Sequence, residues 1–288
     1  MTLIRPGPFR LQSPVRLTKL AMIRRVRAVF NDQMRGEKPV VRSEHSLFGP
    51  GTVIWRVHGD VITMMVGGVA ALLLQMLHPK VLAGVWDHSD FRDNMLGRLR
   101  RTARFISLTT YGSAEDAEAA IARVRSVHDG VNGTLPDGTP YSATDPRLLA
   151  WVHVTEALCF IESWIRYGNH DLGADDQDRY FAEMSRIAIA LGAEPVPATR
   201  AEAEQLVQEM RGELLSDKRT REVADIVMLQ RPDNAIEASI QAMITEAAAD
   251  LLPPWAREMH GLSVSPIARP LVRTGTLAVA RTLRWAFR

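Results

Sequence analysis

One uncharged apolar segment limits the folds that this chain can adopt. It runs from Val61 to Leu77, directly after Asp60, and is followed by His78 and Pro79. A helix over these residues is at the short limit of what crosses a bilayer. We therefore predict a helix over residues 59–77 that is buried in a protein core, with Pro79 ending or kinking it.

Helical signals continue along the rest of the chain, whereas strand-like alternation of polar and apolar residues is nearly absent. Stretches rich in proline and glycine at 1–14, 36–52 and 132–146 are expected to be loops. Ser89 is expected to cap the helix that leads to Tyr111. The fold class is therefore all-α. Further helices are predicted over residues 16–33, 81–86, 91–111, 114–130, 146–167, 175–191, 199–211, 216–227 and 235–252.

The net charge of +2 hides a strong asymmetry. Residues 1–30 carry seven Lys/Arg and no acidic residue, and residues 251–288 carry six Arg and one Glu, so the middle is acidic. Residues 271–288 combine apolar side chains with arginines, as a helix lying on an anionic membrane would. A terminal helix packed on the body, with its arginines in water, is the favoured interpretation. The ends lack an aromatic stacking pattern, which argues against nucleic-acid binding.

Cysteine content and the N-terminus both bear on location. Cys159 is the one cysteine in the sequence and lies in an apolar run, so no disulfide can form within the chain. The first residues show no apolar stretch of the kind found in signal peptides. A reducing compartment, and hence the cytoplasm, is expected.

Two pairs of polar residues indicate what chemistry the protein could perform. Arg98 and Thr102 are four residues apart on one predicted helix, and Arg125 and His128 are three apart on the next, so each pair shares a helix face. A neutral imidazole can bind a haem iron, and a guanidinium can pair with a propionate. Arg98 could also stabilise charge on reduced oxygen, and Thr102 could donate to dioxygen or bond back to its helix. The structural alternatives are an ion pair of Arg98 with Asp93 or another acidic residue, a solvated Arg125 and a core histidine at 128.

The other histidines fit structural roles better. His78 lies at a helix end, His88 follows an acidic residue, and His153 lies on a mostly apolar helix. His153 and Glu156 could supply half of a non-haem iron site, but no second motif completes it. The sequence has no signature of a dinucleotide-binding turn, a phosphate-binding loop or a serine-hydrolase elbow.

Several longer motifs point to one family. They are Leu72–Pro79, Gly84–Phe91, Arg98–Thr102, Arg123–His128 and Tyr141–His153, in collinear order over roughly residues 47–255. Together they resemble the catalytic-domain family of MpaB and the rubber oxygenases (latex clearing proteins). This resemblance implies a single globin-like, multi-helix domain around a b-type haem. It also implies dioxygen chemistry on lipophilic, often unsaturated substrates.

The resemblance implies roles for single residues. His128 corresponds to the proximal iron ligand, and Arg98 and Thr102 correspond to a polar pair beside the haem. Arg101 stands where rubber-cleaving enzymes have a lysine that can cap the distal iron site, and a guanidinium has no lone pair with which to replace it. Ala70 replaces an arginine that is usual in the family, and the acidic residue of the rubber enzymes has no clear match. Rubber cleavage itself is therefore not expected.

These observations lead to one functional expectation, a haem b-dependent oxygenase. His128 would bind the iron, Arg98 and Thr102 would be catalytic, and Arg125 and Arg101 would contact the cofactor. Dioxygen, a lipophilic and unsaturated small molecule, and an electron donor that the sequence does not identify would be its partners.

Three regions are expected along the chain. They are a basic helical extension over residues 1–40, the catalytic domain over 41–255 and a basic segment over 256–288 that could touch a membrane surface. The alternative function is a non-enzymatic haem- or lipid-binding protein associated with such a surface. A pure interaction protein with a decayed haem site is a further alternative.

Overall fold

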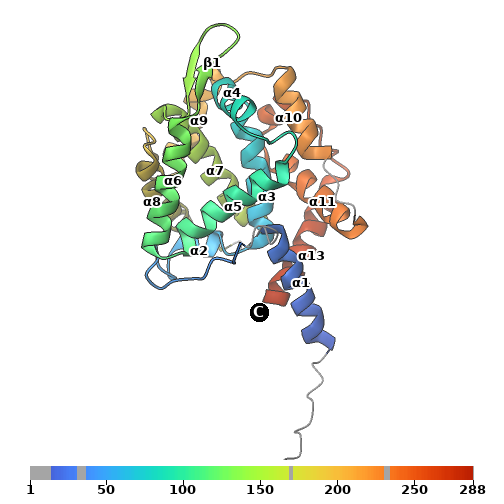
Figure 1. The fold of residues 1–288 in the computed structure, drawn as a ribbon. Helices are drawn as coiled ribbons and strands as arrows, with labels where there is room; N and C mark the ends of the chain where they lie inside the picture. The colour runs from blue at the N-terminus through green and yellow to red at the C-terminus, as the bar shows by residue number, and fades with distance from the viewer. Residues whose placement is uncertain (1–13, 31–36, 169–170, 230–233, 288) are drawn as a thin grey trace, which may run out of the picture.

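The computed structural model describes residues 14–30, 37–168, 171–229 and 234–287, and these residues form the predicted all-α fold (Figure 1). A short 3-10 turn, η2 (Arg211–Glu213), follows α9. The helices are α1 (Pro14–Phe30), α2 (Val53–Val57), α3 (Val61–Gln75), α4 (Pro79–His88), α5 (Met95–Tyr111), α6 (Ala114–Asp129), α7 (Pro146–Tyr167), α8 (Ala174–Leu191), α9 (Arg200–Met210), α10 (Lys218–Leu229), α11 (Ala235–Leu251), α12 (Pro254–His260) and α13 (Arg269–Phe287).

Helix α3 forms the centre of the core, as predicted. Val66, Ala70 and Leu73 are fully buried on it, because a helix that is apolar on all sides has to be covered by its neighbours. Its most extensive contact is with α7. At Gly67 a Cβ atom would lie 2.8 Å from Phe160 Cδ1, so glycine permits the close approach of these two helices. The α3–α7 pair is the base on which the site described below is built.

Side chains and a proline set the helix boundaries around α3 and α5. Asp60 caps α3 by accepting a hydrogen bond from a backbone N–H of the first turn. Pro79 opens α4, and the chain bends by 105° between α3 and α4. Asn94 caps α5 in the same way as Asp60 caps α3. The prediction that Ser89 is this cap was wrong, and the Ser89 hydroxyl instead donates to a carbonyl of α4.

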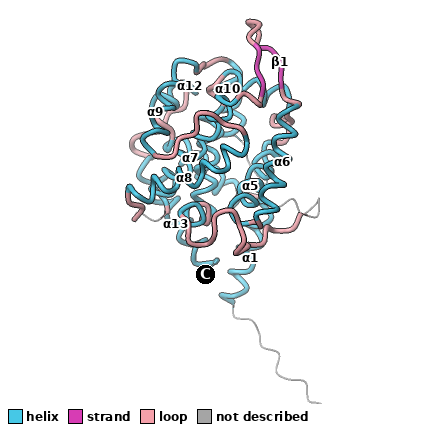
Figure 2. The backbone as a smooth tube through the Cα atoms, turned by 90° about the vertical axis from the view of Figure 1, so that its left-hand side faces the viewer, coloured by secondary structure: helices cyan, strands magenta, loops and turns pink. Residues whose placement is uncertain are grey.

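A short hairpin replaces part of the loop that was expected over residues 132–146. Strands β1 (Asn132–Thr134) and β2 (Pro140–Ser142) pair in antiparallel register, with Gly133 opposite Tyr141. The turn between them includes Gly138 at a φ of 86°, a conformation that favours glycine. The hairpin projects from one end of the helical body (Figure 2).

Helix α13, in the segment expected as a basic extension, packs against α11, α3 and α1. It lies beside α1 at the lower end of the molecule in Figure 1. Asp250, at the C-terminal end of α11, holds it in place with a carboxylate that is 1% exposed. That carboxylate lies 2.9 Å from Arg269 Nε and 2.7 Å from Arg273 Nε, both on α13. Arg166 of α7 approaches the same carboxylate to 3.2 Å.

The other end of α13 is tied to the core through Arg284. Its guanidinium pairs with Asp60, the residue that caps α3, and also donates to the carbonyl of Tyr167 at the end of α7. Trp285 and Phe287 of the same helix are each 45% exposed. Contact of this basic helix with a membrane stays a prediction.

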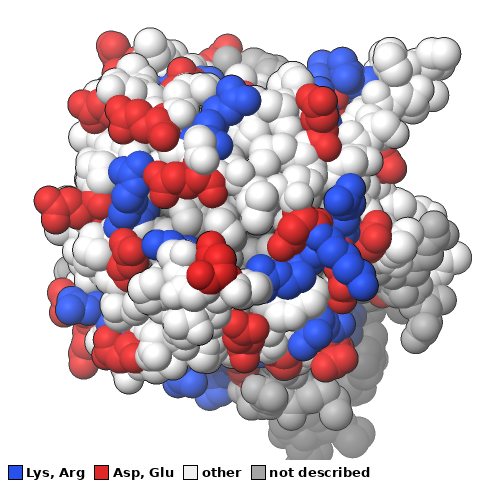
Figure 3. Space-filling model, turned by 90° about the horizontal axis from the view of Figure 1, so that it is seen from above, with Lys and Arg blue, Asp and Glu red and all other residues white. Residues whose placement is uncertain are grey.

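Two further observations describe the surface and the apolar helices. Helix α7 is long and apolar enough to cross a membrane, but 67% of its apolar window is buried inside the protein, as expected of a core helix. The face seen in Figure 3 shows acidic and basic side chains interspersed.

Candidate functional site

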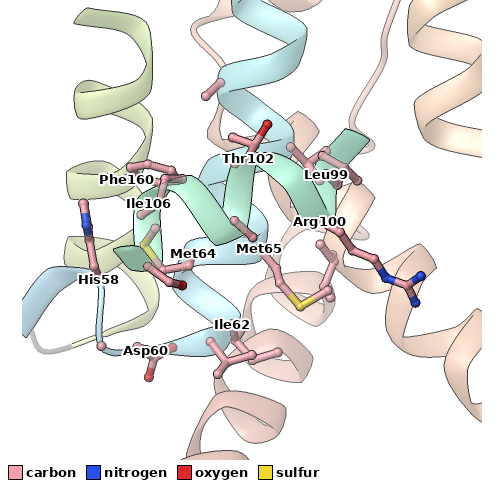
Figure 4. Close-up of a pocket in the computed structure, with 18 of the residues that line it drawn as sticks. His58, Asp60, Ile62, Met64, Met65, Leu99, Arg100, Thr102, Ile106 and Phe160 are labelled. Atoms are coloured by element: carbon pink, nitrogen blue, oxygen red, sulfur yellow. The ribbon is translucent and has the colours of Figure 1, made fainter. Parts of the chain in front are cut away.

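A cavity of about 1060 Å³ lies between α3, α5 and α7, and α11 and α13 complete its wall. This volume slightly exceeds the range of about 300–1,000 Å³ that is typical of ligand pockets. In Figure 4, helix α5 crosses the view, with Ile62, Met64 and Met65 of α3 below it. Most of the wall is apolar. It also includes Val69, Leu72, Leu99, Ala103, Ile106, Phe160, Ile244, Leu283 and Phe287.

Arg98 and Thr102, the predicted catalytic pair, both line this cavity from α5. Arg98 is half-buried, and burial lowers its pKa to about 10, so it keeps its charge at neutral pH. Among the residues that the structure describes, Arg98 has no hydrogen bond or ion pair, so the alternative ion pair with Asp93 is not formed. Thr102 is exposed and lies on the upper side of α5 in Figure 4, at the rim of the cavity.

His128 lies in the last turn of α6, which packs against α5, and is not part of the cavity wall. Its imidazole is half-buried, and burial lowers its pKa. The positive charge of Arg98 acts in the same direction, whereas Asp129 opposes it. The ring forms no hydrogen bond to any residue within the described ranges. A neutral, unpartnered imidazole therefore lies within electrostatic reach of an arginine that faces the cavity.

The other two predicted cofactor contacts lie apart from this pair. Arg101 is exposed and forms an ion pair with Asp90, with 2.8 Å between Nη2 and Oδ1. Arg125 is exposed and donates to the carbonyl of Ala190 in α8 at 3.3 Å, beside a shallow groove between α6 and α8. Neither lines the cavity, and their contact with a cofactor stays a prediction.

Of the remaining histidines of the sequence analysis, His78 and His88 form hydrogen bonds, whereas His153 Nε2 has no partner among the described residues. His78 Nε2 lies 3.4 Å from Glu213 Oε2, and His88 Nε2 lies 3.0 Å from a backbone carbonyl of the hairpin. His153 is buried, and burial lowers its pKa to about 4. Over residues 14–30, 37–168, 171–229 and 234–287, no group of three His, Cys, Asp or Glu side chains could hold a metal ion. The half-site of His153 and Glu156 is therefore not completed by described residues.

His58 was not singled out from the sequence, yet it lines the cavity. Its Nδ1 lies 2.8 Å from Thr110 Oγ1, and its Nε2 lies 3.1 Å from the Tyr180 hydroxyl. Burial lowers its pKa to about 3, so the ring is neutral. Because both nitrogens are engaged, His58 is a satisfied core histidine, and no local sequence signal separates it from the other histidines.

Glu156 of α7 also lines the cavity. Burial raises its pKa to about 7, and no other cause contributes. The carboxyl forms no hydrogen bond or ion pair in the part of the chain that the structure covers. Burial raises the pKa of the Tyr180 hydroxyl and of the Cys159 thiol, and the negative charge of Glu156 adds to both shifts. The sequence signal for this residue was present, since Glu156 is a charged residue within an otherwise apolar stretch of helix.

The natural protein should lose stability as pH rises, because the Glu156 carboxyl ionises, and the Glu156→Gln variant should not show this loss. The pKa of the Glu156 carboxyl is about 7 in the folded protein and near 4.5 in the unfolded chain. The stability of the natural protein should therefore fall relative to the variant as pH rises from about 4.5 to 7, by up to about 3 kcal/mol. Urea unfolding of both proteins at pH 5 and pH 8 measures this difference. Parallel pH profiles would show that the carboxylate is solvated, and Glu246→Gln, at an exposed position on α11, is the control.

The residues near Arg98 fit a haem iron by the chemistry of their donors. A histidine binds haem iron through an unprotonated ring nitrogen that has no other partner, and His128 meets both conditions among the described residues. Arg98, charged and without an ion-pair partner among described residues, is suited to an anionic group beside it. Both nitrogens of His58 are engaged. His153 is also neutral, and its Nε2 has no partner among the described residues, but it is buried in α7, whereas His128 lies within electrostatic reach of Arg98.

Comparison with known proteins gives one result. A family model described as ER-bound oxygenase mpaB/B'/Rubber oxygenase, catalytic domain, matches residues 55–285. No curated protein and no solved structure matches the chain. The matched range includes the cavity helices α3, α5 and α7 and nearly all of α13.

Proposed function

Because this chain belongs to the catalytic-domain family of the mpaB and rubber oxygenases and is therefore an oxygenase, we propose that it depends on haem b and acts on a lipophilic, unsaturated small molecule. The observation that carries this proposal is the large apolar cavity whose wall includes Arg98, within electrostatic reach of the neutral and unpartnered His128. The family match supports the oxygenase class, and the donor chemistry supports the cofactor.

His128 would hold the haem iron from α6. When bound, the haem supplies the binding and activation of dioxygen, which no protein side chain provides. Since burial and Arg98 both keep the imidazole unprotonated, its nitrogen lone pair is available without the loss of a proton.

Arg98 would stabilise negative charge that develops during the reaction. Its pKa of about 10 leaves it protonated at neutral pH, and its half-buried position strengthens its electric field. Thr102 lies one helical turn further along α5 and could donate a hydrogen bond from the rim of the cavity. The alternative role of Thr102 is local support of its helix.

The cavity wall would bind the substrate and exclude water. Met64, Met65, Leu99 and Ile106 present flexible or branched apolar side chains from α3 and α5. Contact with such a wall stabilises a lipophilic chain through the hydrophobic effect. The same contact removes water that would compete for reactive species.

The Arg101–Asp90 ion pair argues against one activity of the family, the cleavage of rubber. Arg101 occupies the position that resembles the capping lysine of the rubber-cleaving enzymes, but it is paired at the surface with Asp90. A guanidinium in that state cannot act as an amine ligand. We therefore do not propose rubber as the substrate, and the electron donor and the cytoplasmic location stay predictions.

The proposal is tested by supplying haem during expression and recording the visible absorption spectrum of the purified protein. We expect a Soret band that corresponds to about one haem per chain, and oxygen consumption by the reduced protein when unsaturated lipids are added. A protein without a Soret band after reconstitution would refute the haem assignment. A Soret band without substrate-dependent oxygen consumption would favour the non-enzymatic haem-binding alternative.

A further inference from the structure

Most of the cavity wall is apolar, and Glu156 is an acidic group on it whose bonding capacity is unused among the described residues. Arg98 is unpaired as well, but several other polar side chains of the wall are engaged. Gln75 donates to the carbonyl of Val152, and Asp60 is paired with Arg284. Both nitrogens of His58 have partners as well. Glu156 has none among the described residues, although it faces the same space.

The position of Glu156 makes it part of the site for a bound molecule. It lies one helical turn before Phe160, which also lines the cavity, so the two share a face of α7. Ile106 of α5 lines the same cavity, and both side chains are labelled in Figure 4. A ligand chain that covers Ile106 and Phe160 would therefore bring its end group within a helical turn of Glu156.

The charge state of Glu156 restricts that end group. Burial alone raises its pKa to about 7, and the arginines of the wall do not shift it. At neutral pH the group is thus a mixture of carboxylic acid and carboxylate, and both forms can accept a hydrogen bond from a hydroxyl. A carboxylate on the ligand would be repelled at this position and would be drawn toward Arg98 instead. A hydrocarbon would displace water from the half-buried carboxyl without replacing its hydrogen bonds, which is unfavourable.

Building on the proposed function, we propose that the cavity binds an uncharged lipophilic alcohol and that Glu156 accepts the hydrogen bond of its hydroxyl group. The hydroxyl fixes one end of the molecule on α7. The apolar chain then lies along the wall formed by α3 and α5, toward Arg98 and Thr102. Glu156 is thus a binding and orienting residue for the substrate.

Three ligands that differ only at one end test this inference, namely oleyl alcohol, 9-octadecene and oleic acid. Their affinities are measured by equilibrium dialysis of radiolabelled ligand below its aggregation limit, with the full chain both as purified and after haem is supplied. We expect the alcohol to bind about tenfold more tightly than the hydrocarbon, which corresponds to about 1.4 kcal/mol. Glu156→Leu should abolish this preference, whereas Glu156→Gln, which still accepts a hydrogen bond, should keep most of it.

The controls distinguish a failure of this inference from a failure of the haem assignment. Glu246→Leu, at an exposed glutamate of α11 outside the cavity, should leave all three affinities unchanged. Equal affinities for alcohol and hydrocarbon, or a preference that survives in Glu156→Leu, would overturn the inference. Tightest binding of oleic acid with dependence on Arg98 would also overturn it. Because the readout is binding, it remains interpretable if the haem assignment fails, and a Soret band remains interpretable if the alcohol preference fails.

Discussion

The haem-loaded His128→Ala variant is expected to lack the Soret band of the natural protein. Alanine removes the one imidazole that is neutral, unpartnered among described residues and within reach of Arg98. Loss of a residue that merely supports a metal ligand lowers metal affinity roughly 10–100-fold, and loss of the ligand itself should cost more. Haem titration followed by absorbance measures the change.

Two comparisons show whether such a loss is specific. His45→Ala removes an exposed histidine and should leave the spectrum unchanged. Added imidazole should restore the Soret band of His128→Ala by occupying the space of the missing ring, provided that the variant is folded by circular dichroism. A full Soret band in His128→Ala without added imidazole would show that another residue binds the iron.

Replacing Asp250 with alanine is expected to lower the free energy of unfolding by about 3 kcal/mol. The buried carboxylate lies within 3.2 Å of Arg166, Arg269 and Arg273, and its removal leaves three positive charges close together. These arginines are 27–42% exposed, so water offsets part of the loss. The value therefore falls at the low end of what breaking a buried ion pair costs. Urea unfolding gives the magnitude.

Proteolysis can show which part of the fold Asp250→Ala destabilises. Trypsin should cut Asp250→Ala faster within α13, which has several arginines, while the helices of the core stay protected. Asp250→Asn keeps the shape of the side chain and should be less destabilised than the alanine variant. Asp225→Ala, at an exposed aspartate of α10, is the matched control. Unchanged cleavage of α13 would show that its packing on α11 and α3 holds it without Asp250.

The parts of the fold that depend on local sequence could be predicted. Because α3 has no polar face, its burial at the centre of the core could be predicted from composition alone. The choice between Ser89 and Asn94 as a helix cap could not be made in this way, because both have the required chemistry and tertiary packing decides which one is used. The same holds for the hairpin around Gly138, whose strands are only three residues long.

The candidate site could likewise be predicted only where local sequence determines it. Arg98 and Thr102 share a helix face by spacing, and both line the cavity. The approach of His128 to Arg98 depends on how α6 packs against α5, and the partner of Arg125 lies on α8. The unpaired state of Glu156 could not be predicted from its neighbours in sequence, since it depends on how α3, α5, α11 and α13 pack around the cavity.

The dependence of the cavity on α13 has a consequence for how each new molecule is made. A ribosome adds residues from the N-terminus onward at about 5–20 per second, so α3, α5 and α7 emerge well before the arginines that dock on Asp250 and Asp60. During that interval the apolar wall around Met65 and Leu99 lacks the cover that Leu283 and Phe287 of α13 provide. A nascent chain that stalls before α13 would expose this wall to chaperones and proteases, so quality control would act after the other helices of the cavity have been made.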